Sequence, residues 1–347
     1  MSLQTQFIKF EKNIRLTWQD DKLKKIREKD DSIRSDIRAA FKKEGYPVKN
    51  FFQQGSYATK TTIIPLNDDY DIDVAVVIDN EEAPENSVEV KKTLRDVLVK
   101  RNLKDPKIKL PCVTAQYFKL EEKHFHLDYP IYKKENGSYR IAIGKEHSGD
   151  DIKKWEKSDP KGLLEWLNDS SKFSDDKAFA QYKRLVKYLK RWRDFKFSEP
   201  ERRKVYSIGL AVMARESFQK SISVDGDISD VHSLKDTIEK IMMPTYFTIT
   251  SKDSQGNPQY NIEVKIPKQP CRDIFDKHGK TIGTLIYNRL SKLNNKLDDV
   301  IAEKSLKKQC ETLVKDVFGD DFPVPENNNN GNKKFKEPGF VASPQGA

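Results

Sequence analysis

Two aspartates stand two positions apart in a stretch that alternates like a β-strand. The segment 71–78 reads DIDVAVVI, so Asp71 and Asp73 share one face of the strand while the opposite face is apolar. Two carboxylates held side by side repel each other, which is costly unless a cation lies between them. In proteins, Mg²⁺ is commonly held by one or two carboxylates together with substrate phosphates. The pair therefore predicts a metal site that acts on a phosphate-bearing substrate.

A third carboxylate and a glycine–serine pair extend this site. The segment 124–132 reads HFHLDYPIY and alternates, which places Asp128 on the polar face of a second strand. If the two strands are neighbours, three carboxylates could hold two metal ions about 4 Å apart, the separation used for in-line displacement at phosphorus. Upstream, Gly55 and Ser56 follow a strand-like stretch that ends at Gln54. Glycine admits close backbone approach and serine adds a hydroxyl beside free N–H groups, so this pair predicts a phosphate cradle.

Each of these motifs has an ordinary structural explanation when taken alone. An Asp-x-Asp pair on a strand is common, a Gly-Ser pair is usually a turn, and Asp128 could simply be a solubilising residue on an edge strand. Their joint occurrence, in this order and in strand contexts, is what favours catalysis.

The same residues resemble a known enzyme family. The glycine–serine pair and the three aspartates are similar to the signature of the DNA polymerase β-type nucleotidyltransferases, and the run 54–61, QGSYATKT, resembles the cGAS/DncV-like enzymes of bacterial anti-phage (CBASS) systems. Later landmarks agree: SDP at 158–160 is similar to the start of that family's helical domain, LKRW at 189–192 to its lysine-bearing helix, and FGDDFP at 318–323 to its closing segment. The resemblance implies an α+β fold with two lobes, in which a polymerase β-like mixed sheet with flanking helices precedes a C-terminal helical domain.

The resemblance also implies a function and its residues. The enzyme would join nucleoside triphosphates into a cyclic di- or trinucleotide second messenger. Its catalytic and metal-binding residues would be Asp71, Asp73 and Asp128 around two Mg²⁺ ions, with Mn²⁺ as an alternative. One ion would lower the pKa of the acceptor hydroxyl, and the other would neutralise the donor triphosphate. The expected substrate-binding residues are Gln54, Gly55, Ser56, Lys187, Lys190 and Ser207.

One position departs from the family pattern. Relatives often carry a Ser-Tyr pair, whose tyrosine stacks on a base, where this chain has Ser207-Ile208. Isoleucine cannot stack in that way, so Tyr206 or another aromatic residue would have to substitute for it.

Periodicity in the first half predicts the elements that would position the site. Residues 19–44 repeat apolar positions at helical spacing, and Gly45-Tyr46-Pro47 follows as a stop signal. Asn136-Gly137 predicts a tight hairpin turn. The other elements expected here are strands near 49–54, 71–79, 111–119, 124–132 and 139–143 and a helix near 88–101.

After residue 151 the pattern becomes helical. The helix predicted over 176–194 has an apolar stripe and, on roughly the opposite side, three lysines: Lys183, Lys187 and Lys190. A lysine stripe is usually a solvated face, but one that faces a cleft would bind triphosphate oxygens. Further helices are expected from Pro160 and over 204–218, 231–243 and 281–316, with a hairpin within 246–264.

These elements group into three expected parts. Residues 1–155 would form the nucleotidyltransferase core with the long N-terminal helix, and residues 156–323 a helical domain that closes the cleft. Residues 324–347, which include four consecutive asparagines, would form a disordered tail. The last residues, SPQGA, resemble flexible C-termini that companion enzymes of some anti-phage operons attach to targets; an ordinary frayed terminus is the alternative.

Composition narrows the class of protein further. The 18 Phe and 13 Tyr argue against wholesale disorder, although 34% of the 347 residues are charged. No apolar run could span a membrane, no signal-peptide core is visible, and three scattered cysteines form neither a disulfide framework nor a zinc ribbon. We therefore expect a cytoplasmic monomer with no membrane partner. The net charge of +10 attracts phosphates, but basic and acidic residues are interleaved, so nucleic acid is not a required partner.

Three other functions fit parts of the sequence. An enzyme of the same superfamily could make a linear oligonucleotide or modify an RNA end. A catalytically silent nucleotide or RNA sensor would use the basic residues but gains nothing from clustered carboxylates near phosphates. A helical scaffold would explain the charged helices but neither the glycine–serine pair nor the paired aspartates.

Overall fold

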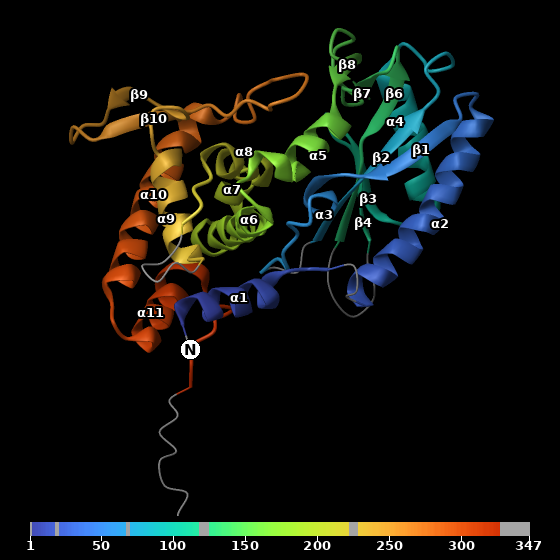
Figure 1. Ribbon diagram of the computed structural model, residues 1–347. Coiled ribbons are helices and arrows are strands. Elements are labelled where there is room, and N and C mark those ends of the chain that lie inside the picture. The colour runs from blue at the N-terminus through green and yellow to red at the C-terminus, as the bar shows by residue number, and fades with distance from the viewer. Residues whose placement is uncertain (1, 18–20, 67–69, 118–124, 222–227, 327–347) are drawn as a thin grey trace, which may run out of the picture.

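A β-sheet flanked by helices lies beside a lobe made almost entirely of helices (Figure 1). The computed structural model describes residues 2–17, 21–66, 70–117, 125–221 and 228–326. Within these ranges, no helix is both long enough and apolar enough to cross a membrane.

Over the described ranges, eight strands form the sheet, in the order β3-β4-β5-β2-β6-β7-β8, with β1 paired to β2. The strands are β1 (Val48–Gln53), β2 (Tyr70–Ile78), β3 (Lys104–Ile108), β4 (Val113–Tyr117), β5 (Phe125–Tyr129), β6 (Ile131–Glu135), β7 (Ser138–Ala142) and β8 (Trp155–Ser158). The five strands predicted from the sequence are confirmed, whereas β3 and β8 were not predicted.

The strand predicted over 124–132 runs parallel to β2 and is interrupted at Pro130. Its first half, β5, pairs with the beginning of β2, and its second half, β6, pairs with the end of β2 in the same register. Proline has no N–H to donate to a ladder, but its carbonyl accepts the N–H of Val76 at 2.9 Å. The break lets β5 pair with β4 and lets β6 pair with β7. The β6–β7 turn has φ of 49° at Asn136 and 81° at Gly137, which confirms the predicted hairpin.

Two helices, α2 (Asp21–Lys43) and α4 (Ser87–Lys100), pack on one face of the sheet. Phe41 of α2 and Leu94 of α4 belong to the same buried cluster as Val74 and Val76 of β2. Because side chains alternate along a strand, this packing turns Asp73 toward the opposite face. The helix predictions 19–44 and 88–101 are confirmed within a few residues.

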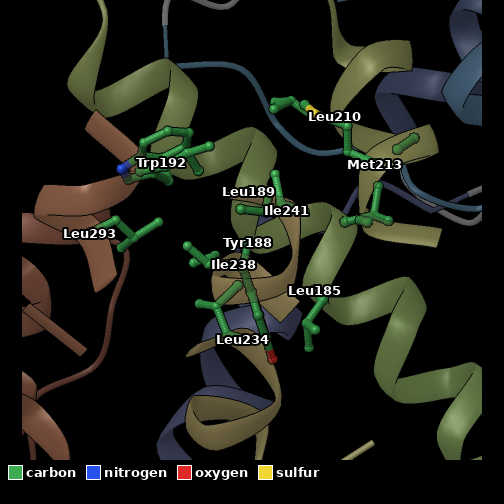
Figure 2. Close-up of a cluster of buried hydrophobic side chains, with 14 of the residues drawn as sticks. Leu185, Tyr188, Leu189, Trp192, Leu210, Met213, Leu234, Ile238, Ile241 and Leu293 are labelled. Atoms are coloured by element: carbon green, nitrogen blue, oxygen red, sulfur yellow. The ribbon is translucent and has the colours of Figure 1, made fainter. Parts of the chain in front are cut away.

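The helical lobe is built around α6 (Asp176–Lys196). Figure 2 shows Leu185, Tyr188 and Trp192 of this helix within a cluster of buried apolar side chains. The other elements of the lobe are α5 (Pro160–Asn168), the 3₁₀ helix η1 (Ser170–Lys172), α7 (Glu199–Arg202), α8 (Ser207–Ser217), α9 (Asp230–Ile241), the hairpin strands β9 (Phe247–Lys252) and β10 (Pro258–Ile262), α10 (Gly279–Ala302), α11 (Leu306–Leu313) and the π-helical turn η2 (Val314–Phe318). The helix predicted over 281–316 is divided into α10 and α11.

The first helix, α1 (Leu3–Ile14), packs in the core of the helical lobe (Figure 1). Its Phe10 ring lies 4.6 Å from that of Phe318 and 5.4 Å from that of Tyr188, measured between centroids. Directly after α1, the Leu16 N–H donates to the Thr62 carbonyl at 3.2 Å. This part of the expected 1–155 core therefore completes the core of the other lobe and then joins the segment that follows Gly55 and Ser56.

We expect Phe10→Ala to lower the free energy of unfolding by about 3–5 kcal/mol, because the ring is fully buried. Urea unfolding measures the change. Phe195→Ala is the matched control, since 38% of that side chain is exposed, and it should cost about 1 kcal/mol or less. Equal losses for the two variants would contradict the placement of α1.

Candidate active site

Parallel pairing of β2 with β5 brings the predicted aspartates together. Asp73 is the register partner of Asp128, and Asp71 is the partner of His126. Residues in register on parallel strands project to the same face, so Asp73 and Asp128 lie next to each other. The backbone places Asp71 two positions before Asp73; its side chain is outside the part of the chain that the structure describes.

Gly55 packs directly against one of these carboxylates. It begins the short helix α3 (Gly55–Ala58) with φ of +64°, and the Gln54 N–H before it donates to the Asp73 carbonyl at 2.9 Å. A Cβ placed on Gly55 would lie 2.2 Å from Oδ2 of Asp73, far inside van der Waals contact. Only glycine satisfies both the backbone conformation and the contact. The glycine–serine pair thus lies directly beside the acidic strand.

A cavity of about 440 Å³ opens at this point between the two lobes. Its lining includes Gly55, Ser56 and Asp73 from the sheet lobe and Lys190 and Ser207 from the helical lobe. Pockets of this size are typical for small molecules. Gln54 also lines the cavity, and its side chain hydrogen-bonds to the Tyr132 hydroxyl at 3.1 Å.

Asp128 lies beside this cavity rather than among the described residues that line it. Its Oδ2 is 3.3 Å from the Nζ of Lys109, so a positive charge already faces the third carboxylate. The ion pair partly offsets the repulsion between Asp128 and Asp73.

The three lysines of the α6 stripe contact other parts of the protein and do not simply face solvent or an empty cleft. Lys190 is buried, and its Nζ donates to the Thr61 carbonyl at 2.9 Å and to the Thr61 hydroxyl at 3.1 Å. Lys183 donates to the Thr59 carbonyl at 3.0 Å, and Lys187 pairs with Glu11 of α1. The stripe therefore fastens α6 to α1 and to the segment after α3. Among the described residues, Lys190 lines the cavity and Lys187 does not.

The burial of Lys190 leads to a testable prediction about how stability depends on pH. Burial, together with the neighbouring charge of Arg193, lowers the pKa of Lys190 from 10.5 to about 7. Between these values the unfolded chain binds the proton that the folded chain releases, so folding gains stability as the pH rises. We expect the free energy of unfolding of the unmodified protein, relative to that of Lys190→Met, to increase by up to about 1.4 kcal/mol per pH unit from pH 7 to 10.

Chemical denaturation across this pH range measures the difference. Lys183, whose pKa burial also lowers to about 7, is present in both proteins, so its contribution cancels. A difference that does not change with pH would contradict the assignment.

Ser207 lies where α8 begins, and Arg193 of α6 donates a hydrogen bond to its Oγ. Ile208, at the position where the resemblance implied a stacking tyrosine, lines the cavity. Tyr206 packs instead on Phe275, with ring centroids 5.8 Å apart, and is not among the described lining residues. The described lining therefore lacks Tyr206 but includes two other aromatic residues, Tyr57 and Tyr132.

Several lining residues were not foreseen from the sequence. Arg193 and Asp194 form an ion pair of 2.7 Å on the cavity wall. Arg193 stands three residues after Lys190, so helical spacing alone could have placed it on the same face. Glu156 and Arg272 also line the cavity. Arg272 lies in an irregular segment, where no periodic signal points to it.

Comparison with known proteins identifies the family. Residues 1–170 match the model of the SMODS family, described as the Second Messenger Oligonucleotide or Dinucleotide Synthetase domain. Residues 1–170, just under half of the chain, therefore carry a domain of this family. A "Cyclic GMP-AMP synthase" of Escherichia albertii is 28% identical over 202 residues, which make up 56% of this chain and 42% of the relative. The match thus spans less than half the length of that relative.

Solved structures show the same fold. The Vibrio cholerae DncV cyclic AMP-GMP synthase, in complex with a linear intermediate, has a TM-score of 0.63 at 17% identity and covers 90% of this chain and 93% of its own. The Bradyrhizobium diazoefficiens enzyme CdnG in complex with GTP has a TM-score of 0.63 at 16% identity, covering 92% and 96%. The Escherichia coli MS115-1 CdnC:HORMA-deltaN complex gives 0.62 at 15%, covering 92% and 98%. The predicted α+β, DncV-like nucleotidyltransferase fold is confirmed.

Nucleotidyltransferases of this family are generally metal-dependent, and the donor set here fits a hard cation. Carboxylate oxygens from two adjacent strands are the ligands that Mg²⁺ prefers. Among the described side chains no group of three His, Cys, Asp or Glu residues stands ready for a metal, and the Asp71 side chain is outside that description. The described pair, Asp73 and Asp128, would supply two of the three predicted ligands.

Proposed function

We propose that this protein joins nucleoside triphosphates into a cyclic di- or trinucleotide second messenger that acts in defence against phage. The observation that carries the proposal is the placement of Asp73 beside Asp128, with Gly55 packed on Asp73, at the edge of an inter-lobe cavity. A pure binding protein gains nothing from adjacent carboxylates at a site for phosphates. The match of residues 1–170 to the SMODS family supports the same function.

In this proposal Asp71, Asp73 and Asp128 hold two Mg²⁺ ions, for which Mn²⁺ can substitute. When bound, such ions supply positive charge to the donor triphosphate and lower the pKa of the acceptor hydroxyl. The protein's own part is positioning. The bare Gly55 backbone lets the Asp73 carboxylate lie directly against α3, and the Ser56 hydroxyl, 3.2 Å from that of Thr62, lies on the same wall.

Positive charge on the opposite wall comes from α6. Arg193 and the protonated form of Lys190 both line the cavity, so they would attract the triphosphate from the helical lobe. A bound phosphate would in turn favour the protonated form of Lys190. Lys190 already bonds to Thr61, so it would share its Nζ between this anchor and a phosphate oxygen. Gln54 and Ser207 are the remaining proposed substrate contacts, and both lie on the lining. Lys187, held by Glu11, would act through the placement of α6 rather than by touching substrate.

The proposals about localisation, oligomeric state and partner proteins rest on the sequence. We propose that the protein is a cytoplasmic monomer that needs no nucleic acid, and that companion proteins act on its C-terminal tail. Of the expected tail, residues 324–347, all but the first three residues lie outside the part of the chain that the structure describes.

One assay tests the function. The protein is incubated with the four ribonucleoside triphosphates and Mg²⁺ or Mn²⁺, and the products are then treated with phosphatase. A product that survives is a ring, as expected, because it has no terminal phosphate. A product that is trimmed would show a linear chain, and nucleotides left unchanged would favour a sensor; either result would contradict the proposal.

A further inference from the structure

A row of side chains crosses the sheet on the face that carries Asp73. Val77 of β2, Tyr132 of β6, Ile141 of β7 and Glu156 of β8 are successive register partners. Val77 lies four residues after Asp73 on the same strand and so shares its face. Tyr132, Ile141 and Glu156 line the cavity. The row therefore forms a floor that runs from the acidic strand to Glu156 on the last strand of the sheet.

Glu156 ends this floor opposite an arginine from the other lobe. The Nη1 of Arg272 lies 3.8 Å from the Oε1 of Glu156, which is an ion pair but longer than a hydrogen bond. The side chains are 31% exposed at Glu156 and 46% exposed at Arg272, so both keep hydrogen-bonding capacity toward the cavity.

The other described carboxylates on the lining, apart from Asp73, are already engaged. Asp159 accepts the Gly162 N–H at 2.8 Å as the N-cap of α5, and Asp194 pairs with Arg193. Glu156 is held more loosely, by the 3.8 Å ion pair with Arg272, and so keeps hydrogen-bonding capacity for a ligand. The walls near it are apolar and include Pro160, Ile266 and Pro270, which suits a flat ring.

A carboxylate in a nucleotide site must meet hydrogen-bond donors. It only accepts hydrogen bonds and repels phosphates, so it bonds either to ribose hydroxyls or to donor groups of the base. The arginine beside Glu156, which needs acceptors, favours the base. Guanine presents two adjacent donors, N1–H and the 2-amino group, to which both carboxylate oxygens can bond. Adenine and cytosine place an acceptor next to their amino group, and uracil has one N–H between two carbonyls. An arginine beside the carboxylate matches the O6 and N7 acceptors of guanine.

Building on the proposed function, we propose that Glu156 and Arg272 bind a guanine base and give this cavity a preference for GTP. Glu156 accepts from N1–H and the 2-amino group, and Arg272 donates to O6 and N7. The two residues come from different lobes, so a bound guanine also links the sheet lobe to the helical lobe. Stacking by a tyrosine at position 208 is not needed for this recognition.

Binding measured without turnover tests the inference. Isothermal titration of the full chain with non-hydrolysable GTP and ATP analogues, in the presence of Mg²⁺, should show GTP bound about 10- to 100-fold more tightly. The inosine analogue, which lacks the 2-amino group, should bind with intermediate affinity. Glu156→Gln, which is nearly isosteric, should bring the three affinities within a few-fold of one another. Glu165→Gln on the exposed face of α5 is the control and should keep the preference.

The outcomes separate this inference from the proposed function. An unchanged GTP preference in a folded Glu156→Gln variant, or no nucleotide binding by the unmodified protein, would overturn the inference. If the unmodified protein makes a cyclic product and its base preference does not depend on Glu156, the proposed function stands and the inference falls. If binding prefers guanine through Glu156 but no ring is made, the inference stands and the proposed function falls.

Discussion

Asp73→Asn should reduce product formation by about 10³-fold or more while the fold is retained. The substitution keeps the shape of the side chain but removes the charge that a bound metal and the reacting phosphates require. It also removes the repulsion between Asp73 and Asp128, which are register partners. We therefore expect the thermal midpoint of the metal-free variant to stay the same or rise slightly, because sites built for catalysis are often held at a cost in stability.

The combination of lost activity and kept stability distinguishes a metal ligand from a structural residue. Asp128→Asn should behave in the same way, although it also leaves the Lys109 ammonium without its carboxylate partner at 3.3 Å. Asp150→Asn is the control, since 96% of that side chain is exposed, and it should keep full activity. Full activity in Asp73→Asn, measured as product per enzyme over time, would refute the proposed catalytic site.

Gly55→Ala should lower activity by about 10²-fold or more, because the added methyl group must displace either α3 or the Asp73 carboxylate. The Cβ would lie 2.2 Å from Oδ2 of Asp73, and a shift of about 1 Å in a catalytic group costs this much. Alanine at φ of +64° adds a backbone cost of about 1–2 kcal/mol, which should appear as a lower unfolding midpoint.

A second glycine separates the two effects. Gly256, in the β9–β10 hairpin, also has a positive φ, +85°, but a Cβ placed on it would have no described atom within 4 Å. Gly256→Ala should therefore show a comparable backbone cost without the loss of activity. If the two variants had equal activity in the nucleotide assay, contact between Gly55 and Asp73 would not be important for the reaction.

The local features of this protein follow from its amino-acid sequence. Alternation over 71–78 fixed which face of the strand carries the aspartates, and Asn136-Gly137 fixed a hairpin turn. Helical periodicity found α2, α4 and α6 within a few residues of their observed bounds. These features depend on neighbours within a few positions along the chain, so the residue types are enough to specify them. The family motifs also predicted the fold, because their order along the chain is characteristic of its topology.

The tertiary structure alone decided which distant segments meet. Only strand pairing places Asp128 beside Asp73, and only packing carries α1 from the start of the chain into the core of the helical lobe. The sequence predicted that the lysines of α6 form either a solvated or a phosphate-binding stripe. In the folded protein they bond instead to backbone carbonyls and to a carboxylate. Glu156 meets Arg272 across the cavity although no pattern links them. Such contacts depend on how apolar surfaces from the whole chain are buried together. This long-range packing produces no periodic sequence pattern near the residues that it brings into contact.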